Sequence, residues 1–373
     1  MEALLEGITS IGIDQIIMMV IGGILMYLGI AKEYEPTLLI PMGFGTILVN
    51  FPGSGVITHT INGVEQVGIF DLLFDSGISN ELYPLLLFIG IGAMIDFGPL
   101  LQNPAMLFFG AAAQFGIFFT VCVAVIFGFD LNEAASIGII GAADGPTSIF
   151  VANQLAPHLL GPITVAAYSY MALVPIIQPF AIKLVTTKEE RQIRMPYHAA
   201  SVSKTTRIFF PIVITIVASL IAPTASPLVG CLMYGNIMRE CGVLDRLSET
   251  AQNALVNIIS IILGLAISVK MEAGLFLNIQ TLMIIVFGLV AFIMDTIGGV
   301  LFAKVLNLFR KNKINPMVGG AGISAFPMSS RVIQRLATEA DPQNFVLNYS
   351  ISANVSGQIA SVVAGGLLLG YFS

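Results

Sequence analysis

The sequence predicts an all-α, polytopic membrane protein with about ten transmembrane elements, in two inverted-topology repeats whose broken helices meet at the midplane. Three observations predict this fold class: an apolar composition, a succession of segments long enough to span a bilayer, and self-similarity at a fixed offset. Hydrophobic residues make up 56% of the 373 positions and charged residues 10%, and the mean hydropathy is +0.90. A soluble domain carries about 25% charged residues, so a soluble globule is excluded.

Five apolar segments and one interrupted segment fill the first membrane domain, residues 1–185. A span needs about 20 mostly apolar residues. Four segments have that length: Ile11–Ile30, Leu82–Leu101, Ala105–Gly128 and Gly161–Val185. The fifth, Leu38–Phe51, is shorter and contains Pro41, so we expect it to be kinked or partly re-entrant. Because no basic leader precedes the first span, we interpret it as a true span rather than a signal peptide.

A polar segment separates this domain from the second. Six of the sixteen Lys and Arg residues lie between Lys183 and Arg207. Basic loops remain on the cytoplasmic side, so residues 186–207 are predicted to be a cytoplasmic loop. Residues 208–373 then form the second membrane domain, with an interrupted segment at Asn315–Ala337. Its apolar segments are Ile208–Pro223, Leu228–Met238, Ala254–Val269, Leu282–Val305 and Phe345–Tyr371.

The two interrupted segments are related by an internal repeat. A shift of 181 residues aligns Gly141–Ile176 with Gly322–Gly357 without a gap, and 11 of 36 positions are identical. Chance similarity between apolar segments does not explain the matched Pro, Ser and Tyr residues. These include Pro146 with Pro327, Ser148 with Ser329 and Tyr168 with Tyr349.

The turns that precede the two interrupted segments carry opposite charges. Asp130 and Glu133 make the first turn acidic, whereas Arg310, Lys311 and Lys313 make the second basic. Since positive turns remain in the cytoplasm, the two turns are expected on opposite sides of the membrane. The repeat is therefore predicted to be inverted, an arrangement that places substrate and ion sites near the bilayer midplane.

Asp144 lies in the first interruption, directly before Gly145 and Pro146. An ionisable residue inside a membrane segment is costly and marks a functional site. Asp144 is also a good N-cap for a half-helix that begins near Pro146. Because Ser or Asn would cap without a charge, we favour cation binding, and the two roles are compatible.

The second interruption has Ala325 at the position of Asp144, but it is rich in oxygen ligands of the kind that hard cations prefer. In the interruption these come from Asn315, Ser324, Ser329 and Ser330, and the last helix adds Asn354 and Ser356. Asn354 matches Leu173 of the first repeat, and both ion ligation and an interhelical hydrogen bond remain open for it. Arg331 can hold a carboxylate bidentately, on an internal Asp or on an anionic substrate.

Four motifs occur in an order that resembles a known family: GAADGPTSIF from Gly141, YSYMALVP from Tyr168, NPMVGGAGISAFPMSSRV from Asn315 and NYSISANVSGQIAS from Asn348. Over nearly its whole length the chain is similar to the β subunit of the sodium-pumping, biotin-dependent decarboxylases, which act on oxaloacetate, methylmalonyl-CoA, glutaconyl-CoA or malonate. The resemblance implies an inner (plasma) membrane decarboxylase of carboxybiotin that couples CO₂ release to Na⁺ export. The compact chain favours the methylmalonyl-CoA or glutaconyl-CoA systems.

The resemblance also implies roles for single residues and partners. The implied Na⁺ ligands are Asp144, Asn354, Ser324 and Asn315. The implied catalytic residues are Tyr170, Arg331 and Ser324, with Tyr170 as general acid. The implied carboxybiotin contacts are Arg331, Asn315 and Gly319. Expected partners are a biotin carrier protein, a carboxyltransferase α subunit, a small membrane-anchoring subunit (γ/δ) and further copies of β, and no nucleic acid.

Two other functions remain open from the residues alone. An Na⁺-coupled secondary transporter of a small carboxylate would have the same repeats and the same buried carboxylate, but it would work without biotin. A structural membrane anchor for a soluble complex would keep its activity after Asp144→Asn. The four motifs favour the decarboxylase pump over both.

Overall fold

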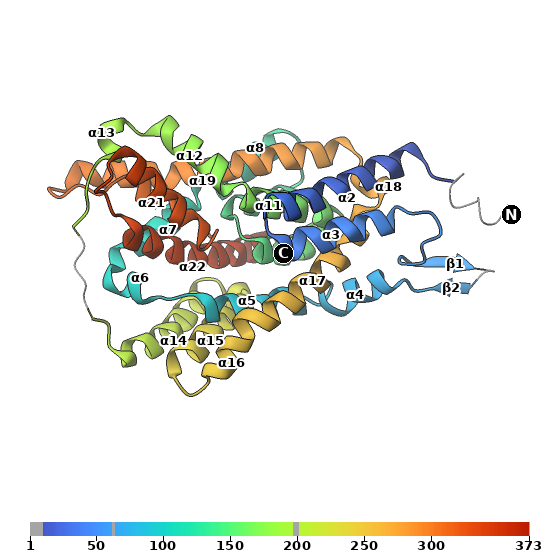
Figure 1. The fold of residues 1–373 in the computed structure, drawn as a ribbon, viewed down its shortest axis with the longest axis horizontal. Coiled ribbons are helices and arrows are strands. Elements are labelled where there is room, and N and C mark those ends of the chain that lie inside the picture. Colours follow the sequence, from blue (N-terminus) through green and yellow to red (C-terminus); the bar gives the residue numbers. More distant parts are fainter. Residues whose placement is uncertain (1–9, 62–63, 197–200, 373) are drawn as a thin grey trace.

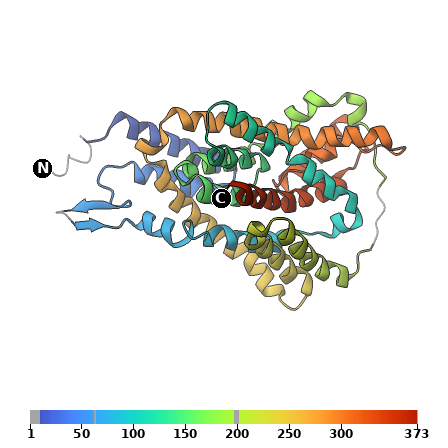
Figure 2. The same ribbon diagram turned by 180° about the vertical axis from the view of Figure 1, so that it is seen from behind.

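The protein is described by a computed structural model that covers residues 10–61, 64–196 and 201–372. Most helices run along one long axis, and a small β-hairpin projects at one end (Figure 1). Helix α13 (Lys188–Arg191) and the turn that follows α19 (Ile279–Phe309) lie at the other end. The view from behind shows the same separation (Figure 2). The basic loop therefore lies at the end opposite the hairpin.

The first half begins with two apolar helices, the hairpin and a succession of short helices. They are α2 (Ile13–Ala31), α3 (Pro36–Val49), β1 (His59–Ile61), β2 (Val64–Gln66), α4 (Ile69–Gly77), α5 (Leu82–Met94), α6 (Gly98–Gln102), η1 (Pro104–Met106), α7 (Leu107–Ala113) and α8 (Phe115–Ile126). The strands are antiparallel, with His59 opposite Gln66. The first interrupted segment and its neighbouring helices follow as α9 (Leu131–Gly138), η2 (Ile139–Ala142), α10 (Gly145–Leu155), η3 (Pro157–Leu159), α11 (Leu160–Ala172) and α12 (Val174–Val185).

The second half has the same general order of elements after α13. It contains α14 (Lys204–Ile221), η4 (Pro223–Ala225), α15 (Ser226–Cys241), α16 (Asp245–Thr250), the π-helical η5 (Ala251–Leu255), α17 (Val256–Ile267), η6 (Ser268–Met271) and α18 (Ala273–Phe276). After α19 come α20 (Met317–Gly320), α21 (Met328–Ala340) and α22 (Leu347–Phe372). Both predicted interruptions are present, between η2 and α10 and between α20 and α21.

Six helices in the described residues are long and apolar enough to cross a membrane. The number becomes eight if each of two bent helix pairs counts as one span. An all-α membrane protein is therefore confirmed, whereas a total of about ten transmembrane elements is not. The difference comes from short elements such as α3, whose 14 residues fall below the length of a full span.

Two predicted spans end or bend earlier than expected. Gly161–Val185 is not one continuous helix, because α11 and α12 are bent by 74° at Leu173. Pro175 lies in the first turn of α12, and a proline cannot continue the backbone hydrogen bonds of the preceding helix. Helix α5 ends at Met94 instead of continuing to Leu101. There the Asp96 side chain accepts a hydrogen bond from the Gly98 N–H over 2.8 Å and turns the chain.

Helices of the first and second halves pack in similar pairs. In the first half α2 packs on α3, and in the second half α14 packs on α15. Between the halves, α3 packs on α17, and α15 packs on α5. Asn50, just after α3, donates to the Met271 carbonyl over 2.8 Å, and Asn236 of α15 donates to the Ile95 carbonyl over 2.8 Å. Each amide thereby satisfies a free carbonyl at a helix end of the other half. The two halves share one core.

The described part of the basic loop, residues 186–196 and 201–207, is attached to the second half. Arg194 donates two hydrogen bonds to Asp341 in the turn before α22, over 2.5 and 3.0 Å. These bonds lower the pKa of the Asp341 carboxyl. Gln192 donates to the Ala340 carbonyl over 2.9 Å. These hydrogen bonds attach the described part of the loop to the turn between α21 and α22.

Candidate functional site

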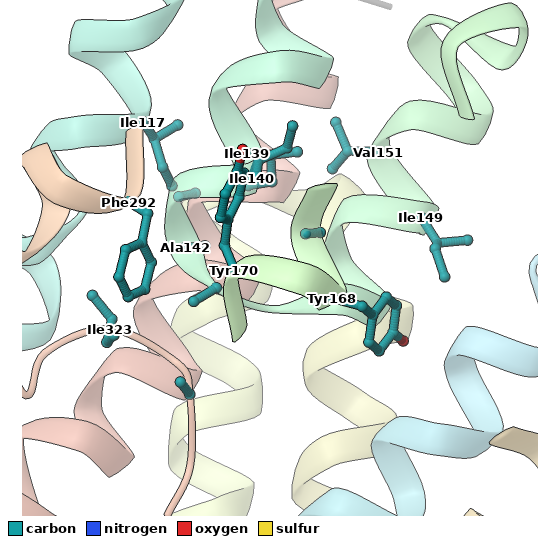
Figure 3. Close-up of a cluster of buried hydrophobic side chains, with 14 of the residues drawn as sticks. Ile117, Ile139, Ile140, Ala142, Ile149, Val151, Tyr168, Tyr170, Phe292 and Ile323 are labelled. Atoms are coloured by element: carbon teal, nitrogen blue, oxygen red, sulfur yellow. The ribbon is translucent and has the colours of Figure 1, made fainter. Parts of the chain in front are cut away.

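The two interruptions meet in the core. In the first, the chain leaves η2 through Ala143, which has left-handed backbone angles (φ 53°, ψ 44°), and enters α10 after Asp144. In the second, the Ser324 N–H donates a hydrogen bond to the Ala142 carbonyl over 2.9 Å. Ala142 and Ile323, one from each interruption, lie in the same buried cluster (Figure 3). A backbone hydrogen bond therefore joins the two interruptions directly.

Asp144 is 4% exposed and caps α10, as the sequence predicts. Its carboxylate accepts hydrogen bonds from the Thr147 N–H (3.3 Å), the Thr147 hydroxyl (2.7 Å) and the Ser361 hydroxyl on α22 (2.9 Å). Among the described residues, Asp144 makes no ion pair with a Lys, Arg or His side chain. Only neutral donors therefore surround this carboxylate, which leaves its charge available to a cation.

Asn354 and Ser324 lie at the second interruption and are buried. The Asn354 amide donates to the Ile323 carbonyl over 2.6 Å, and the Ser324 hydroxyl donates to the Gly357 carbonyl over 3.0 Å. In the described part of the chain, the Asn354 side-chain oxygen has no hydrogen-bond partner. A buried oxygen without a partner is costly, and an amide oxygen is a suitable ligand for a hard cation.

One face of α22 carries the polar groups of both interruptions. Asn354, Gln358 and Ser361 are spaced i, i+4 and i+7, which places them on one side of the helix. Gln358 lies between the other two and donates to the Ser324 carbonyl. At 1.5 Å per residue, Asn354 and Ser361 are about 10.5 Å apart along the axis. Asp144, which Ser361 contacts, and Asn354 therefore lie at two levels of this polar face, about two helical turns apart.

The two tyrosines of α11 point to different sides (Figure 3). The Tyr170 hydroxyl donates to the Ile285 carbonyl on α19. The Tyr168 ring packs against Gly145, where a Cβ atom would lie only 2.2 Å from the Tyr168 ring. Tyr168 is therefore the tyrosine beside the start of α10, and Tyr170 is the tyrosine that contacts α19.

The structure does not place the other three candidate residues in contact with Asp144. The Asn315 amide donates to the carbonyls of Arg191 and Ile193, each over 2.9 Å, and thus holds the basic loop. Gly319 allows α20 to approach α19, since a Cβ atom there would lie 2.0 Å from the Gly299 carbonyl oxygen. Arg331 is exposed on α21.

Comparison with known proteins decides the family. A model of the Na⁺-transporting oxaloacetate decarboxylase beta subunit matches residues 14–372. This chain belongs to that beta-subunit family. It is a component of a Na⁺-translocating decarboxylase.

Members that act on different acids are similar to this beta subunit. The methylmalonyl-CoA decarboxylase subunit beta of Propionigenium modestum is 49% identical, over 98% of this chain and 97% of the relative. The glutaconyl-CoA decarboxylase subunit beta of Acidaminococcus fermentans is 50% identical, over 95% and 92%. The oxaloacetate decarboxylase beta chain of Klebsiella pneumoniae is 43% identical, over 100% and 98%. The family assignment alone does not select one acid.

Four residues around the interruptions of this beta subunit were not predicted from the sequence. Thr147 and Ser361 hold the Asp144 carboxylate, Gln358 holds the Ser324 carbonyl, and Gln178 of α12 donates to the Gly320 carbonyl (2.8 Å) and the Ser329 hydroxyl (2.7 Å). A signal existed for two of them. Gln358 and Ser361 follow Asn354 at helical spacing within one motif.

A basic cavity of about 640 Å³ opens beside the start of the second interruption. Arg310, Lys311 and Lys313 line it together with Tyr349, and its described lining contains no Asp or Glu. The Tyr349 hydroxyl donates to the Pro196 carbonyl over 2.6 Å at its edge. Tyr349 precedes Asn354 by five residues on α22, which is about 7.5 Å along the helix axis. The cavity thus lies at the basic end of α22 but on a different face from Asn354, because five residues turn an α-helix by about 140°.

Proposed function

We propose that this chain decarboxylates carboxybiotin carried by a separate protein and uses the reaction to export Na⁺ across the inner (plasma) membrane. One observation carries the proposal within the family. The Asp144 carboxylate is buried where two interrupted helices meet, and only neutral groups hold it. Such a group binds and releases a cation more readily than a carboxylate already paired with Lys or Arg.

We further propose that the two halves are inverted repeats, which would allow the Asp144 site to open to either side. Each helix that follows an interruption packs on a helix of the other half: α10 packs on α22, and α21 packs on α12. The acidic turn before the first interruption lies beside the beginning of α19, where Phe127 and Phe129 contact Phe287 with ring centroids 5.3 and 5.8 Å apart. The basic turn before the second follows the end of α19. The equivalent turns are therefore associated with opposite ends of one long helix.

In this proposal Na⁺ binds along the polar face of α22. Asp144 supplies the charged ligand at one level, and the unpartnered oxygen of Asn354 offers a separate ligand at the other level, about 10.5 Å along the axis and too far to hold the same ion. Ser361 and Thr147 orient the carboxylate. Ser324 connects the two levels, because its backbone carbonyl accepts from Gln358 and its N–H donates to the first interruption. The ligand oxygens are of the hard type that Na⁺ prefers.

The basic cavity is the proposed entry for the carboxylated group. Biotin that carries a carboxylate, on an acidic or neutral carrier surface, is attracted by Arg310, Lys311 and Lys313 at close range. Arg331 and Gly319 belong to the second interruption, and we propose that they and Asn315 contact the group once it has passed the cavity. The basic end then faces the cytoplasm, where the carrier and the carboxyltransferase are located.

Removing the positive charge of the cavity is expected to weaken binding of the carboxylated carrier without slowing decarboxylation. The variant Arg310→Gln/Lys311→Gln/Lys313→Gln should raise the KM for the carboxylated carrier about tenfold at low salt, with kcat nearly unchanged. High salt should reduce the difference, because it screens exposed charges. Arg246→Gln, an exposed position on α16, is the charge control. An unchanged KM at low salt would reject this entry route.

We propose an acyl-CoA as the acid that feeds this system. The chain aligns with the Acidaminococcus glutaconyl-CoA relative over 353 residues, whereas alignment with the Klebsiella oxaloacetate relative extends over 427 positions, more than the 373 residues present. Segments of the oxaloacetate relative therefore have no counterpart here.

Reconstitution of the complex in proteoliposomes tests both the acid and the coupling. Methylmalonyl-CoA or glutaconyl-CoA is expected to drive Na⁺ uptake that avidin abolishes, because avidin removes access to biotin. Oxaloacetate should drive at least about tenfold less uptake, a ratio that corresponds to roughly 1.4 kcal/mol. Solute uptake by the isolated subunit without biotin would instead favour the Na⁺-coupled carboxylate transporter.

A further inference from the structure

A second buried carboxylate lies outside the site described above. Asp295 of α19 is 0% exposed. One oxygen, Oδ1, accepts a hydrogen bond from the Ile117 N–H at the start of α8 over 2.9 Å. The other, Oδ2, has no partner among the described residues. A cap for α8 requires only one acceptor oxygen, so the second oxygen is not explained by capping.

The free oxygen faces the first interruption. A Cβ atom added at Gly141 of η2 would lie 2.9 Å from Asp295 Oδ2. The region is largely apolar, because Ile117, Ile140 and Phe292 lie near one another in the buried cluster (Figure 3). Gly141 is three residues before Asp144, so any movement of η2 relative to α19 changes the space beside Oδ2.

No described basic side chain neutralises Asp295. The charged and titratable groups of the elements packed on α19 are engaged elsewhere: Glu133 of α9 with His158, Lys183 of α12 with Glu339, Lys304 of α19 itself with Glu190, and Tyr170 of α11 with the Ile285 carbonyl. Tyr168 of α11 packs on Gly145, and Cys122 of α8 is exposed. An uncompensated charge in such a place is unfavourable, so the carboxyl must take a cation to be neutral.

We propose that Asp295 is a second cation-binding carboxyl, which takes a proton at the contact between α19 and the first interruption. One free oxygen in apolar surroundings can hold H⁺, whereas Na⁺ requires several oxygen ligands. Gly141 lies close to Oδ2, and Oδ1 accepts a hydrogen bond from the Ile117 N–H. Because η2 leads directly to Asp144, protonation of Asp295 is linked to the position of the first interruption. The site thus differs from the one at Asp144 in its helix and in its hydrogen-bond partners.

Infrared difference spectroscopy on the purified complex tests the proposal without requiring decarboxylation. A pH step at constant Na⁺ and an Na⁺ step at constant pH, with choline as replacement ion, are recorded for the wild type, Asp295→Asn and Asp144→Asn. Asp295→Asn keeps an acceptor oxygen for the Ile117 N–H, so α8 remains capped. We expect a carboxyl signal that is present in the wild type and in Asp144→Asn and is absent in Asp295→Asn.

The two steps separate the two cations. A signal in the pH step identifies H⁺, as proposed, whereas a signal that appears only in the Na⁺ step would overturn the proposal. Difference spectra of Asp295→Asn that match the wild type in both steps would overturn the proposal. If Asp295→Asn does not assemble, Gly141→Ala serves as the second variant, because its methyl group occupies the space beside Oδ2 and should shift the signal. Since neither step involves carboxybiotin, this result is separable from failure of the proposed function.

Discussion

Asp144→Asn is expected to abolish Na⁺ uptake and Na⁺-stimulated decarboxylation while the protein still folds. The asparagine oxygen can still cap α10, and its amide can donate to the hydroxyls of Thr147 and Ser361. The variant therefore loses the negative charge and keeps the shape. The loss of Na⁺ affinity should exceed the roughly 10–100-fold that removal of an outer-shell partner costs a metal site. Uptake of ²²Na⁺ into proteoliposomes and the Na⁺ dependence of CO₂ release measure it.

A graded series strengthens this test. Ser361→Ala removes one hydrogen bond to the carboxylate and should weaken Na⁺ affinity by about tenfold. Asp14→Asn, an exposed acid in the first turn of α2, should behave as the wild type. If Asp144→Asn retained Na⁺-dependent activity, Asp144 would be only a helix cap, and the chain would act as a structural anchor.

Tyr170→Phe should reduce kcat for decarboxylation by about 10²–10⁴-fold, the usual contribution of a general acid. Its hydroxyl donates to the Ile285 carbonyl in this conformation, so the proton transfer requires the phenol to leave that partner. Single-turnover release of CO₂ from the carboxylated carrier measures the effect. The Na⁺ affinity should change much less than kcat.

Tyr168→Phe is the matched control, because both tyrosines lie on α11 and are buried. Tyr168 packs on Gly145 beside Asp144, so its removal should alter Na⁺ binding more than the proton transfer. Full activity in Tyr170→Phe would eliminate the proton-donor role. The reverse pattern, with Tyr168→Phe as the inactive variant, would transfer that role to the other tyrosine.

Hydropathy predicts the membrane helices well where a helix is long and uninterrupted, as for α2, α19 and α22. It fails at the bend between α11 and α12, because proline alone does not determine a bend. Pro41 and Pro211 lie inside α3 and α14, which each remain single helices, whereas Pro175 lies beside a 74° bend. Neighbouring helices satisfy the free backbone groups in some cases and not in others, and that depends on tertiary packing.

Some residues of the candidate site are likewise predictable from the sequence, and others are not. Asp144 is identifiable because a charge is rare in an apolar helix, and Asn354 because its repeat counterpart is Leu173. Ser361 follows Asn354 at helical spacing, but that spacing does not distinguish a carboxylate partner from a packing residue, because small hydroxyl residues commonly serve only helix packing in membranes. Its role depends on a hydrogen bond that joins residues 217 positions apart in the sequence. The contacts of Asn315 with the basic loop likewise require the folded chain.

The bend at Leu173 has a consequence for the direction of transport. In the proposed inverted arrangement, two identical halves would make the inward-facing and outward-facing states equivalent by a two-fold rotation, with equal free energies. Here the segment that is bent by 74° in the first half corresponds to the unbroken helix α22 in the second. This difference removes the degeneracy, so one state lies lower in free energy before any ion binds. A built-in resting orientation lets a chemical reaction on one side of the membrane produce a vectorial cycle.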